Sequence, residues 1–85
     1  MNEFTKTVRS IVKRIPAGEV MTYQEVAAVA GNPKAARAVA RVMAQNYDES
    51  IPCHRVIRSD GTLGGYNRGG EIRKRAILLD EGALI

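Results

Sequence analysis

Hydrophobic and polar positions alternate at helical spacing in the first part of the chain. Apolar side chains recur every three or four residues between Phe4 and Ile15, and Lys and Arg side chains fall mostly between them. This spacing places the apolar side chains on one face of a helix. Pro16 and the Ala17-Gly18 turn would end it. We therefore predict an amphipathic helix over residues 3–14.

A second helix is predicted to start near Tyr23. Thr22 and Glu25 have the spacing of a capping box. In such a box the Thr22 hydroxyl accepts a hydrogen bond from the backbone N–H of Glu25, and the Glu25 carboxylate accepts one from that of Thr22. These bonds satisfy donors that the first turn of a helix leaves free. The predicted helix buries Val26 and ends at Gly31.

A third helix is predicted over about residues 33–45, with Asn32 as its N-cap and Pro33 as its first residue. Two short helices joined by such a tight link are typical of a helix-turn-helix. Basic and apolar side chains separate onto opposite faces of this helix. The basic face carries Lys34, Arg37, Ala38, Arg41 and Gln45, flanked by Ala36 and Ala40, and the opposite face carries Ala35, Val39, Val42, Met43 and Asn46.

The rest of the chain predicts a hairpin, a loop and a last helix. Residues 56–58 and 62–63 are typical of two strands joined by the turn at 59–61. A flexible Gly-rich loop follows over 64–70, then a helix over about 71–81 with Gly82 as its C-cap. We expect this helix to bury Ile72, Ala76 and Leu79. The expected fold class is mainly α with a small β-hairpin, a winged helix-turn-helix-like DNA-binding domain.

Length and composition narrow the classes of protein. The 85 residues fit one domain over 1–85, and 13 Lys and Arg against 9 Asp and Glu give a net charge of +4. The single Cys and single His exclude an internal disulfide and a Cys/His zinc site, so we expect no metal and no cofactor. We see no membrane-spanning run and no signal peptide, and a free Cys fits a reducing cytosol. We expect a cytoplasmic monomer without a membrane partner, associated with the nucleoid if prokaryotic.

The basic face of the third helix has two interpretations. On an arbitrary helix, a stripe of Lys and Arg is usually a solvated surface. Here the stripe lies on the second helix of a predicted helix-turn-helix, and the neighbouring alanines allow a close approach to a groove. The Lys and Arg side chains would hold phosphates, and one Arg could enter the base stack. DNA binding is therefore favoured, although a transcription regulator would share this pattern.

The Cys53-His54 pair is the sharpest local feature. A thiol that ionises near neutral pH is a strong nucleophile, whereas an arbitrary Cys beside a His is more often a buried structural thiol. In an extended chain, neighbouring side chains point to opposite faces, so His54 would reach the Cys53 sulfur only through a local turn or a bridging water. The imidazole also needs a carboxylate to orient it. The candidates are Glu25, Glu71, Asp80 and Glu81.

These residues lie in segments that resemble the C-terminal, active-site domain of O6-alkylguanine-DNA alkyltransferases. The resemblance covers nearly the whole chain in the right order, and the Pro-Cys-His-Arg-Val motif downstream of Asn-Pro-Lys-Ala-Ala-Arg is highly specific. The matching segments are Gly18 to Gln24, Ala30 to Val39, Ile51 to Ile57, Gly65-Tyr66, Leu78-Leu79 and Glu81-Gly82.

The resemblance implies a single-turnover DNA repair protein that binds the minor groove and flips a damaged guanine out of the duplex. Cys53 would accept the O6-alkyl group irreversibly, His54 would act as a base through a water, and Glu81 would orient His54. Asn46 would match the family's hinge asparagine, which braces the active-site turn. The implied partner is double-stranded DNA carrying O6-alkylguanine, with other repair proteins as further partners.

The resemblance also implies roles in DNA binding. Arg37 would fill the vacated base position, Tyr23 would crowd the target phosphate and promote rotation, and Tyr66 would close the pocket and donate to the guanine ring. Lys74 occupies the position of a family lysine near the pocket. The remaining expected DNA-binding residues are Lys34, Ala36, Arg41 and Arg55.

Three departures from the family pattern stand out. We expect this chain to lack the usual N-terminal domain, the segment from Asn46 to Cys53 is one residue shorter, and the loop after Tyr66 is one residue longer. Alkyltransferase-like proteins, which are also short single domains, bind alkylated guanine without transfer, recruit other repair and generally lack the acceptor Cys. The presence of Cys53 favours transfer over such binding alone. A winged-helix regulator is the remote alternative, because it would explain neither Cys53-His54 nor Tyr66.

Overall fold

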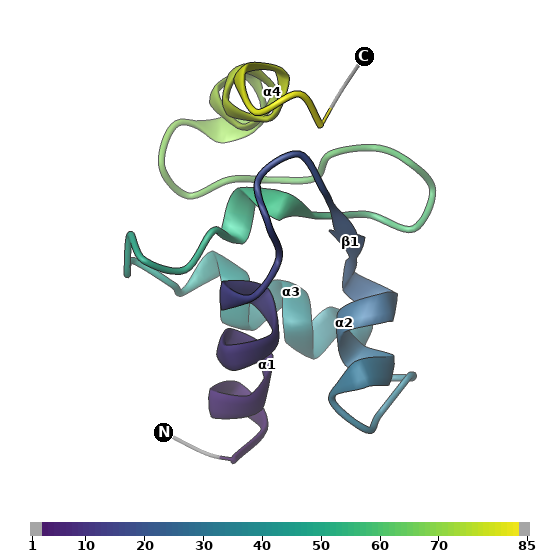
Figure 1. The fold of residues 1–85 in the computed structure, drawn as a ribbon. Helices are drawn as coiled ribbons and strands as arrows, with labels where there is room; N and C mark the ends of the chain where they lie inside the picture. Colours follow the sequence, from purple (N-terminus) through teal and green to yellow (C-terminus); the bar gives the residue numbers. More distant parts are fainter. Residues whose placement is uncertain (1–2, 84–85) are drawn as a thin grey trace.

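The computed structural model describes residues 3–83. Three helices pack together at one end of the molecule, the fourth helix lies at the other end, and the short strands and a 3-10 turn lie between them (Figure 1). The elements in chain order are α1 (Glu3–Lys13), β1 (Met21–Thr22), α2 (Tyr23–Val29), α3 (Ala36–Ala44), the 3-10 turn η1 (Cys53–Arg55), β2 (Val56–Ile57) and α4 (Gly70–Asp80).

The hydrophobic core lies where the inner faces of α1, α2 and α3 meet η1 and β2. The predicted inner faces of α1 and α3 are confirmed, because Val8, Val12 and Val39 are fully buried. Apolar side chains also surround the Cys53 thiol, which is 5% exposed. The buried apolar cluster consists of Val8, Val12, Ile15, Val26, Ala27, Val39, Val42, Met43, Ile51, Cys53 and Val56.

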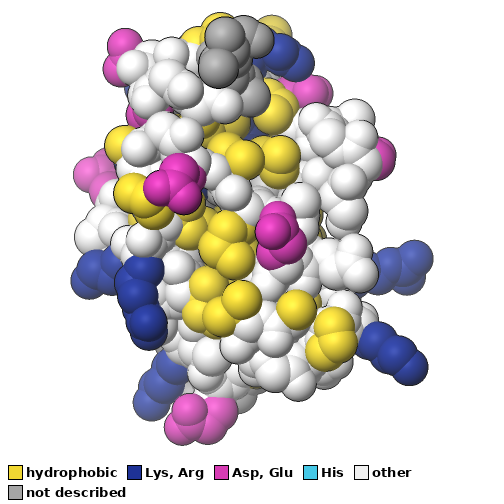
Figure 2. Space-filling view, turned by 45° about the vertical axis from the view of Figure 1, so that its right-hand side comes forward, with side chains coloured by type: hydrophobic (Ala, Val, Ile, Leu, Met, Phe, Trp, Pro, Cys, Tyr) yellow, Lys and Arg dark blue, Asp and Glu magenta, His cyan; other side chains and the backbone are white. Residues whose placement is uncertain are grey.

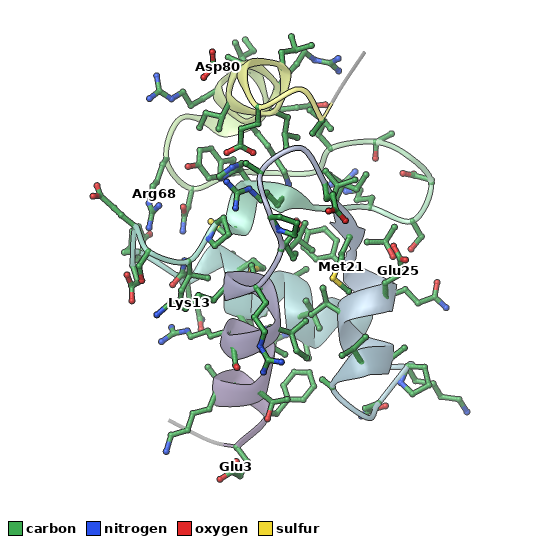
Figure 3. The ribbon with its side chains drawn as sticks, in the orientation of Figure 1. Glu3, Lys13, Met21, Glu25, Arg68 and Asp80 are labelled. Atoms are coloured by element: carbon green, nitrogen blue, oxygen red, sulfur yellow. The ribbon has the colours of Figure 1, made fainter. Side chains whose placement is uncertain are left out.

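The predicted capping box at the start of α2 is confirmed. The backbone N–H of Glu25 donates to Thr22 Oγ1 at 3.0 Å, and the backbone N–H of Thr22 donates to Glu25 Oε1 at 2.9 Å. Figure 3 shows Glu25 beside the first turn of α2. The box fixes where the chain leaves β1 and becomes helical, and it thereby fixes the position of Tyr23.

The prediction that Asn32 caps the third helix is wrong, because Asn32 belongs to the end of α2. Its N–H donates to Ala27 O at 2.9 Å, and the N–H of Gly31 donates to Ala28 O at 3.0 Å. With Gly31 at a φ of +92°, this pairing is a Schellman motif, after which proline is common. A turn closed by Ala35 N–H donating to Asn32 O follows, and α3 begins only at Ala36.

The small sheet differs from the predicted hairpin. β1 and β2 pair in parallel, with Met21 opposite Val56 and Thr22 opposite Ile57. The turn after β2 keeps one bond of the expected hairpin, in which Arg58 N–H donates to Thr62 O at 3.0 Å. The backbone of β2 is therefore hydrogen-bonded to β1, which comes from a distant part of the chain. The mainly helical, helix-turn-helix-like fold with a small two-stranded sheet is confirmed.

The buried face of α4 is not the one that its apolar residues predict. Ile72 and Leu79 are 87% and 52% exposed, whereas Lys74 and Leu78 are buried. The Lys74 ammonium donates to Leu63 O at 2.6 Å and to Gly65 O at 3.3 Å. These hydrogen bonds offset the free energy that burial of the ammonium costs. The contact of α4 with the preceding loop is therefore made by a lysine side chain.

Apolar side chains gather in the middle of the face drawn in Figure 2, and Lys and Arg side chains project around its lower edges. Within residues 3–83, no helix is long and apolar enough to cross a membrane.

Burial of Lys74 predicts a pH-dependent stability. Desolvation lowers the pKa of Lys74 to about 8, from 10.5 in an unfolded chain. Between these two values the unfolded state binds more protons than the folded state, so the free energy of unfolding should rise as the pH increases from 8 to 10. We expect this rise in the wild type and not in Lys74→Met, measured by urea unfolding at each pH. Parallel pH profiles for the two proteins would contradict it.

Candidate functional site

A cavity of about 380 Å³ lies beside Cys53. Its walls come from the start of α2, from α3, from η1 and from the loop that precedes α4. Two alanines on α3 leave room between the helix and the thiol, and two tyrosines bring phenol groups to the cavity. Its size lies within the range of small-molecule sites. The lining residues are Tyr23, Ala40, Met43, Ala44, Cys53, Arg58, Gly65, Tyr66 and Asn67.

The Cys53 and His54 side chains line different cavities. The chain forms a tight 3-10 turn here, in which Cys53 N–H donates to Ile51 O at 2.8 Å and Arg55 N–H donates to Pro52 O at 2.9 Å. His54 lines an open cavity of about 550 Å³, and Tyr66 lines both cavities. The rings of His54 and Tyr66 meet edge to face, 6.3 Å apart.

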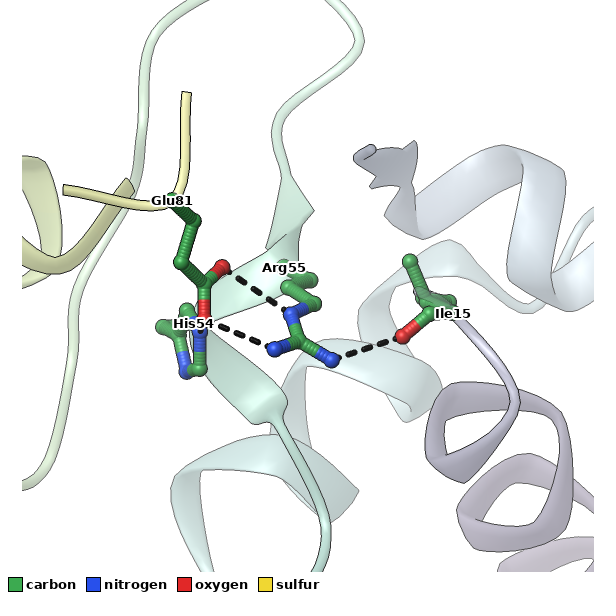
Figure 4. A network of polar contacts seen from close by, with 4 residues as sticks. All are labelled: Ile15, His54, Arg55 and Glu81. Atoms are coloured by element: carbon green, nitrogen blue, oxygen red, sulfur yellow. Dashed lines mark hydrogen bonds and ion pairs between the residues drawn. The ribbon is translucent and has the colours of Figure 1, made fainter. Parts of the chain in front are cut away.

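Glu81 is the carboxylate that meets His54. Glu81 Oε2 lies 3.0 Å from His54 Nε2, and both side chains are largely buried (Figure 4). Glu25 caps α2 instead, and Asp80 lies on the outer side of α4 (Figure 3). Hydrogen bonds, first from Arg55 and then from His54, lower the pKa of Glu81, so that this carboxylate is charged at neutral pH. Because Nε2 faces the carboxylate, Nδ1 is the ring nitrogen left to accept a proton.

Arg55, for which a DNA-binding role is expected, makes its hydrogen bonds inside the domain. Its Nε donates to Glu81 Oε1 at 3.0 Å, its Nη2 donates to Glu81 Oε2 at 2.7 Å, and its Nη1 donates to Ile15 O at 2.7 Å. These three bonds engage the guanidinium inside the domain (Figure 4). Arg55 therefore joins the end of α4 to the end of α1 and holds the carboxylate that meets His54.

Asn46, expected to brace the active-site turn, is fully buried. Its amide pairs with the backbone of Asp48, with both bonds at 3.3 Å. This contact closes the chain just after α3 and not at the turn that contains Cys53. Lys74 likewise lies beneath the loop and does not face solvent, and its ammonium is 5.7 Å from the centre of the Tyr23 ring.

Asn67 is a residue of the cavity that the sequence analysis did not identify. Its Nδ2 donates to three carbonyl oxygens after or at the end of α3, those of Met43 at 3.4 Å, Ala44 at 2.9 Å and Asn46 at 2.7 Å. The only sequence signal was its place as part of a longer loop, which gives no contact by itself.

Tyr23 lines the cavity and is partly buried. Burial is the main cause that raises its pKa, so the hydroxyl keeps its proton at neutral pH and can donate a hydrogen bond. Gly64, at a φ of +76°, lies next to it: a Cβ there would come within 3.4 Å of Tyr23 Oη. The positive φ is the reason that glycine suits this position, since a Cβ at that distance from the phenol oxygen would make an ordinary van der Waals contact.

The basic residues of the helix-turn-helix lie on its outer surface. Arg37 and Arg41 are exposed on α3, and Ala36 beside them is partly buried. Lys34 is exposed too, but it lies in the turn before α3 and not on the helix. The same helix supplies one wall of the cavity through Ala40, so the basic surface and the cavity share one element.

The donor set gives no support for a metal site. Within residues 3–83, no group of three or more His, Cys, Asp or Glu side chains could hold a metal ion.

Comparison with known proteins finds close relatives. The rat (Rattus norvegicus) methylated-DNA–protein-cysteine methyltransferase is 49% identical over 83 residues, which cover 95% of this chain and 40% of the rat protein. A crystal structure of Mycobacterium tuberculosis OGT in complex with DNA superimposes with a TM-score of 0.89 at 42% identity, covering 98% of this chain and 52% of that one.

A third similar protein is S. pombe Atl1, in complex with damaged DNA containing O6-carboxymethylguanine. It has a TM-score of 0.86 and 39% identity, and the match covers 96% of this chain and 78% of that one. The chain thus spans less than half of the rat relative and most of Atl1. The model of the 6-O-methylguanine DNA methyltransferase DNA-binding domain matches residues 3–83, and this chain belongs to that family.

Proposed function

We propose that this chain is the active-site domain of a direct-reversal DNA repair protein, which moves the alkyl group of O6-alkylguanine irreversibly to Cys53. The observation that carries the proposal is the buried Cys53 thiol beside a cavity that also holds the Tyr23 and Tyr66 side chains. The similarity to named methyltransferases over 95% of the chain supports it.

In the proposed reaction, the Cys53 sulfur attacks the alkyl carbon of the lesion. The new S–C bond forms as the C–O bond to guanine breaks, and guanine leaves with the electron pair. His54 Nδ1 takes the thiol proton through a water, and the charged Glu81 stabilises the imidazolium through Nε2. The phenol of Tyr66 donates a hydrogen bond to the departing guanine. The sulfur ends as a thioether, so each molecule acts once.

DNA binding is proposed for the exposed surface of α3. Arg37 and Arg41 lie on that surface, and Lys34 extends it from the preceding turn. We propose that α3 enters the minor groove, that its small alanines allow close approach, and that Arg37 fills the space of the flipped base. Extrusion of a base costs a few kcal/mol, which phosphate contacts and stacking of the Arg would offset.

A second candidate function is recognition without transfer. Its support is the similarity to Atl1, of which the match covers 78%. Such a protein would bind alkylated guanine in the same cavity and leave the lesion intact. The two functions differ in one measurable outcome, the fate of the alkyl group.

Intact-mass measurement separates transfer from recognition. After incubation with a duplex carrying O6-methylguanine, we expect the protein to gain one methyl group, mapped to Cys53 by peptide sequencing. Cys53→Ala should bind the same duplex without any change of mass. Tight binding by the wild type with no gain of mass would reject transfer and favour the second candidate.

Replacing Glu81 should slow transfer without abolishing binding. Glu81→Gln removes the negative charge that faces His54 Nε2, so we expect the rate of methyl transfer to fall about 100-fold, the size of a general-base contribution. Glu71→Gln removes a carboxylate from the exposed start of α4 and is the matched control. Equal rates for the two variants would argue against the proposed role of Glu81. Circular dichroism checks that loss of the Arg55 contacts leaves the fold intact.

Arg37 and Arg73 should differ in their effect on binding. If Arg37 stacks in place of the flipped base, Arg37→Ala should weaken binding to a lesion duplex about tenfold, as expected for one stacking contact. Arg73→Ala removes the same charge from α4 and is expected to have a smaller effect. Fluorescence anisotropy with labelled duplex measures both. Equal losses of affinity would mean that Arg37 acts only as a charge.

A further inference from the structure

We infer that Asn67 is a positioning residue that sets the opening of the Cys53 cavity, and thereby the size of alkyl group that the cavity admits. The inference about the opening stands on the geometry alone, and the inference about the alkyl group rests on the proposed function.

The carboxamide of Asn67 holds the loop to the end of α3. Its shortest bonds run from Nδ2 to Asn46 O at 2.7 Å and to Ala44 O at 2.9 Å. The last carbonyls of a helix have no partner inside the helix, so they are ready acceptors. Asn67 therefore caps α3 from a segment that lies more than twenty positions further along the chain.

The orientation of this carboxamide is fixed. Three carbonyl oxygens face Nδ2, and turning the group over would place Oδ1 against them. Within the described part of the chain, the buried Oδ1 has no hydrogen-bond partner. The side chain thus holds the loop through its donor atom, and a side chain of the same size without that donor would not.

This tether closes one wall of the cavity. Asn67 and its neighbours Gly65 and Tyr66 line the cavity from the loop, while Ala40, Met43 and Ala44 line it from α3. Asn67 connects the two walls directly. The loop is also held on the side of α4, where Lys74 donates to Leu63 O and Gly65 O and the N–H of Gly70 donates to Tyr66 O at 2.8 Å. None of these bonds joins the loop to α3, so loss of the Asn67 bonds would let the loop move away from α3 and widen the opening.

The single cysteine gives a direct probe of this opening. Iodoacetamide and N-benzyliodoacetamide share one reactive group and differ in size, and Cys53 is the only thiol of the chain, the group with which both react fastest. Rates of labelling are measured by intact mass for the wild type, Asn67→Ala, Asn67→Asp and the control Asn32→Ala, which changes an exposed asparagine in the turn before α3.

We expect both Asn67 variants to raise the ratio of the benzyl rate to the iodoacetamide rate about tenfold, the equivalent of one or two hydrogen bonds. Asn32→Ala should keep the wild-type ratio. Asn67→Asp matches the size of Asn67 but replaces the donor with an acceptor, so a wild-type ratio for Asn67→Asp would overturn the inference. If Asn67→Ala fails to fold by circular dichroism, the Asn67→Asp result decides.

Transfer from duplexes carrying O6-methylguanine or O6-benzylguanine tests the consequence for the substrate. We expect the benzyl-to-methyl ratio of transfer rates to rise in both Asn67 variants. If the labelling ratio changes but the transfer ratio does not, Asn67 has no role in selecting the size of the alkyl group. Its role in setting the opening of the cavity would still hold. Absence of any transfer in the wild type would reject the proposed function, and the labelling ratio would still decide the role of Asn67 in the opening.

Discussion

The carboxylate of Glu81 is the contact on which the arrangement of the site depends. It accepts from His54 and twice from Arg55, and Arg55 in turn donates to Ile15 O. One acidic group thereby joins the end of α4, the turn that holds Cys53 and the end of α1. Charge-assisted bonds of this kind are strong and directional. The orientation of the imidazole and the packing of α4 against the rest of the domain are therefore set together.

Local signals in the sequence predicted the elements whose causes are local. The Thr22–Glu25 capping box is complete within one helical turn, and the structure contains it. Gly31-Asn32-Pro33 was also a local signal, but it has two meanings. Gly31 was interpreted as the end of the second helix and Asn32-Pro33 as the start of the third, whereas the Schellman bonds make both Gly31 and Asn32 part of the end of α2. Residue type alone does not distinguish a helix end from a helix start here, because Gly, Asn and Pro occur together at both.

Long-range polar contacts were not predictable from periodicity. Lys74 lies inside, where carbonyls of a loop accept from its ammonium, and apolar Ile72 lies outside because residues two positions apart on a helix face opposite sides. Arg55 was expected to bind DNA from the resemblance to the family, and no pattern in the sequence indicated its bonds to Glu81 and to the end of α1. The choice of Glu81 among four carboxylates needed the resemblance to a family, since spacing gave no preference. Neither periodicity nor the resemblance to the family indicated a contact for Asn67.

α3 combines three tasks along its length. Its outer surface carries Arg37 and Arg41, its inner side contributes Ala40 and Met43 to the cavity, and its last carbonyls hold Asn67. A rigid helix moves as one body, so a shift of its basic surface against DNA would also shift the cavity wall and the loop attached to it. The proposed DNA contact and the opening at Cys53 would then be coupled through one short element. That coupling requires no second domain, because each of these groups lies within residues 3–83.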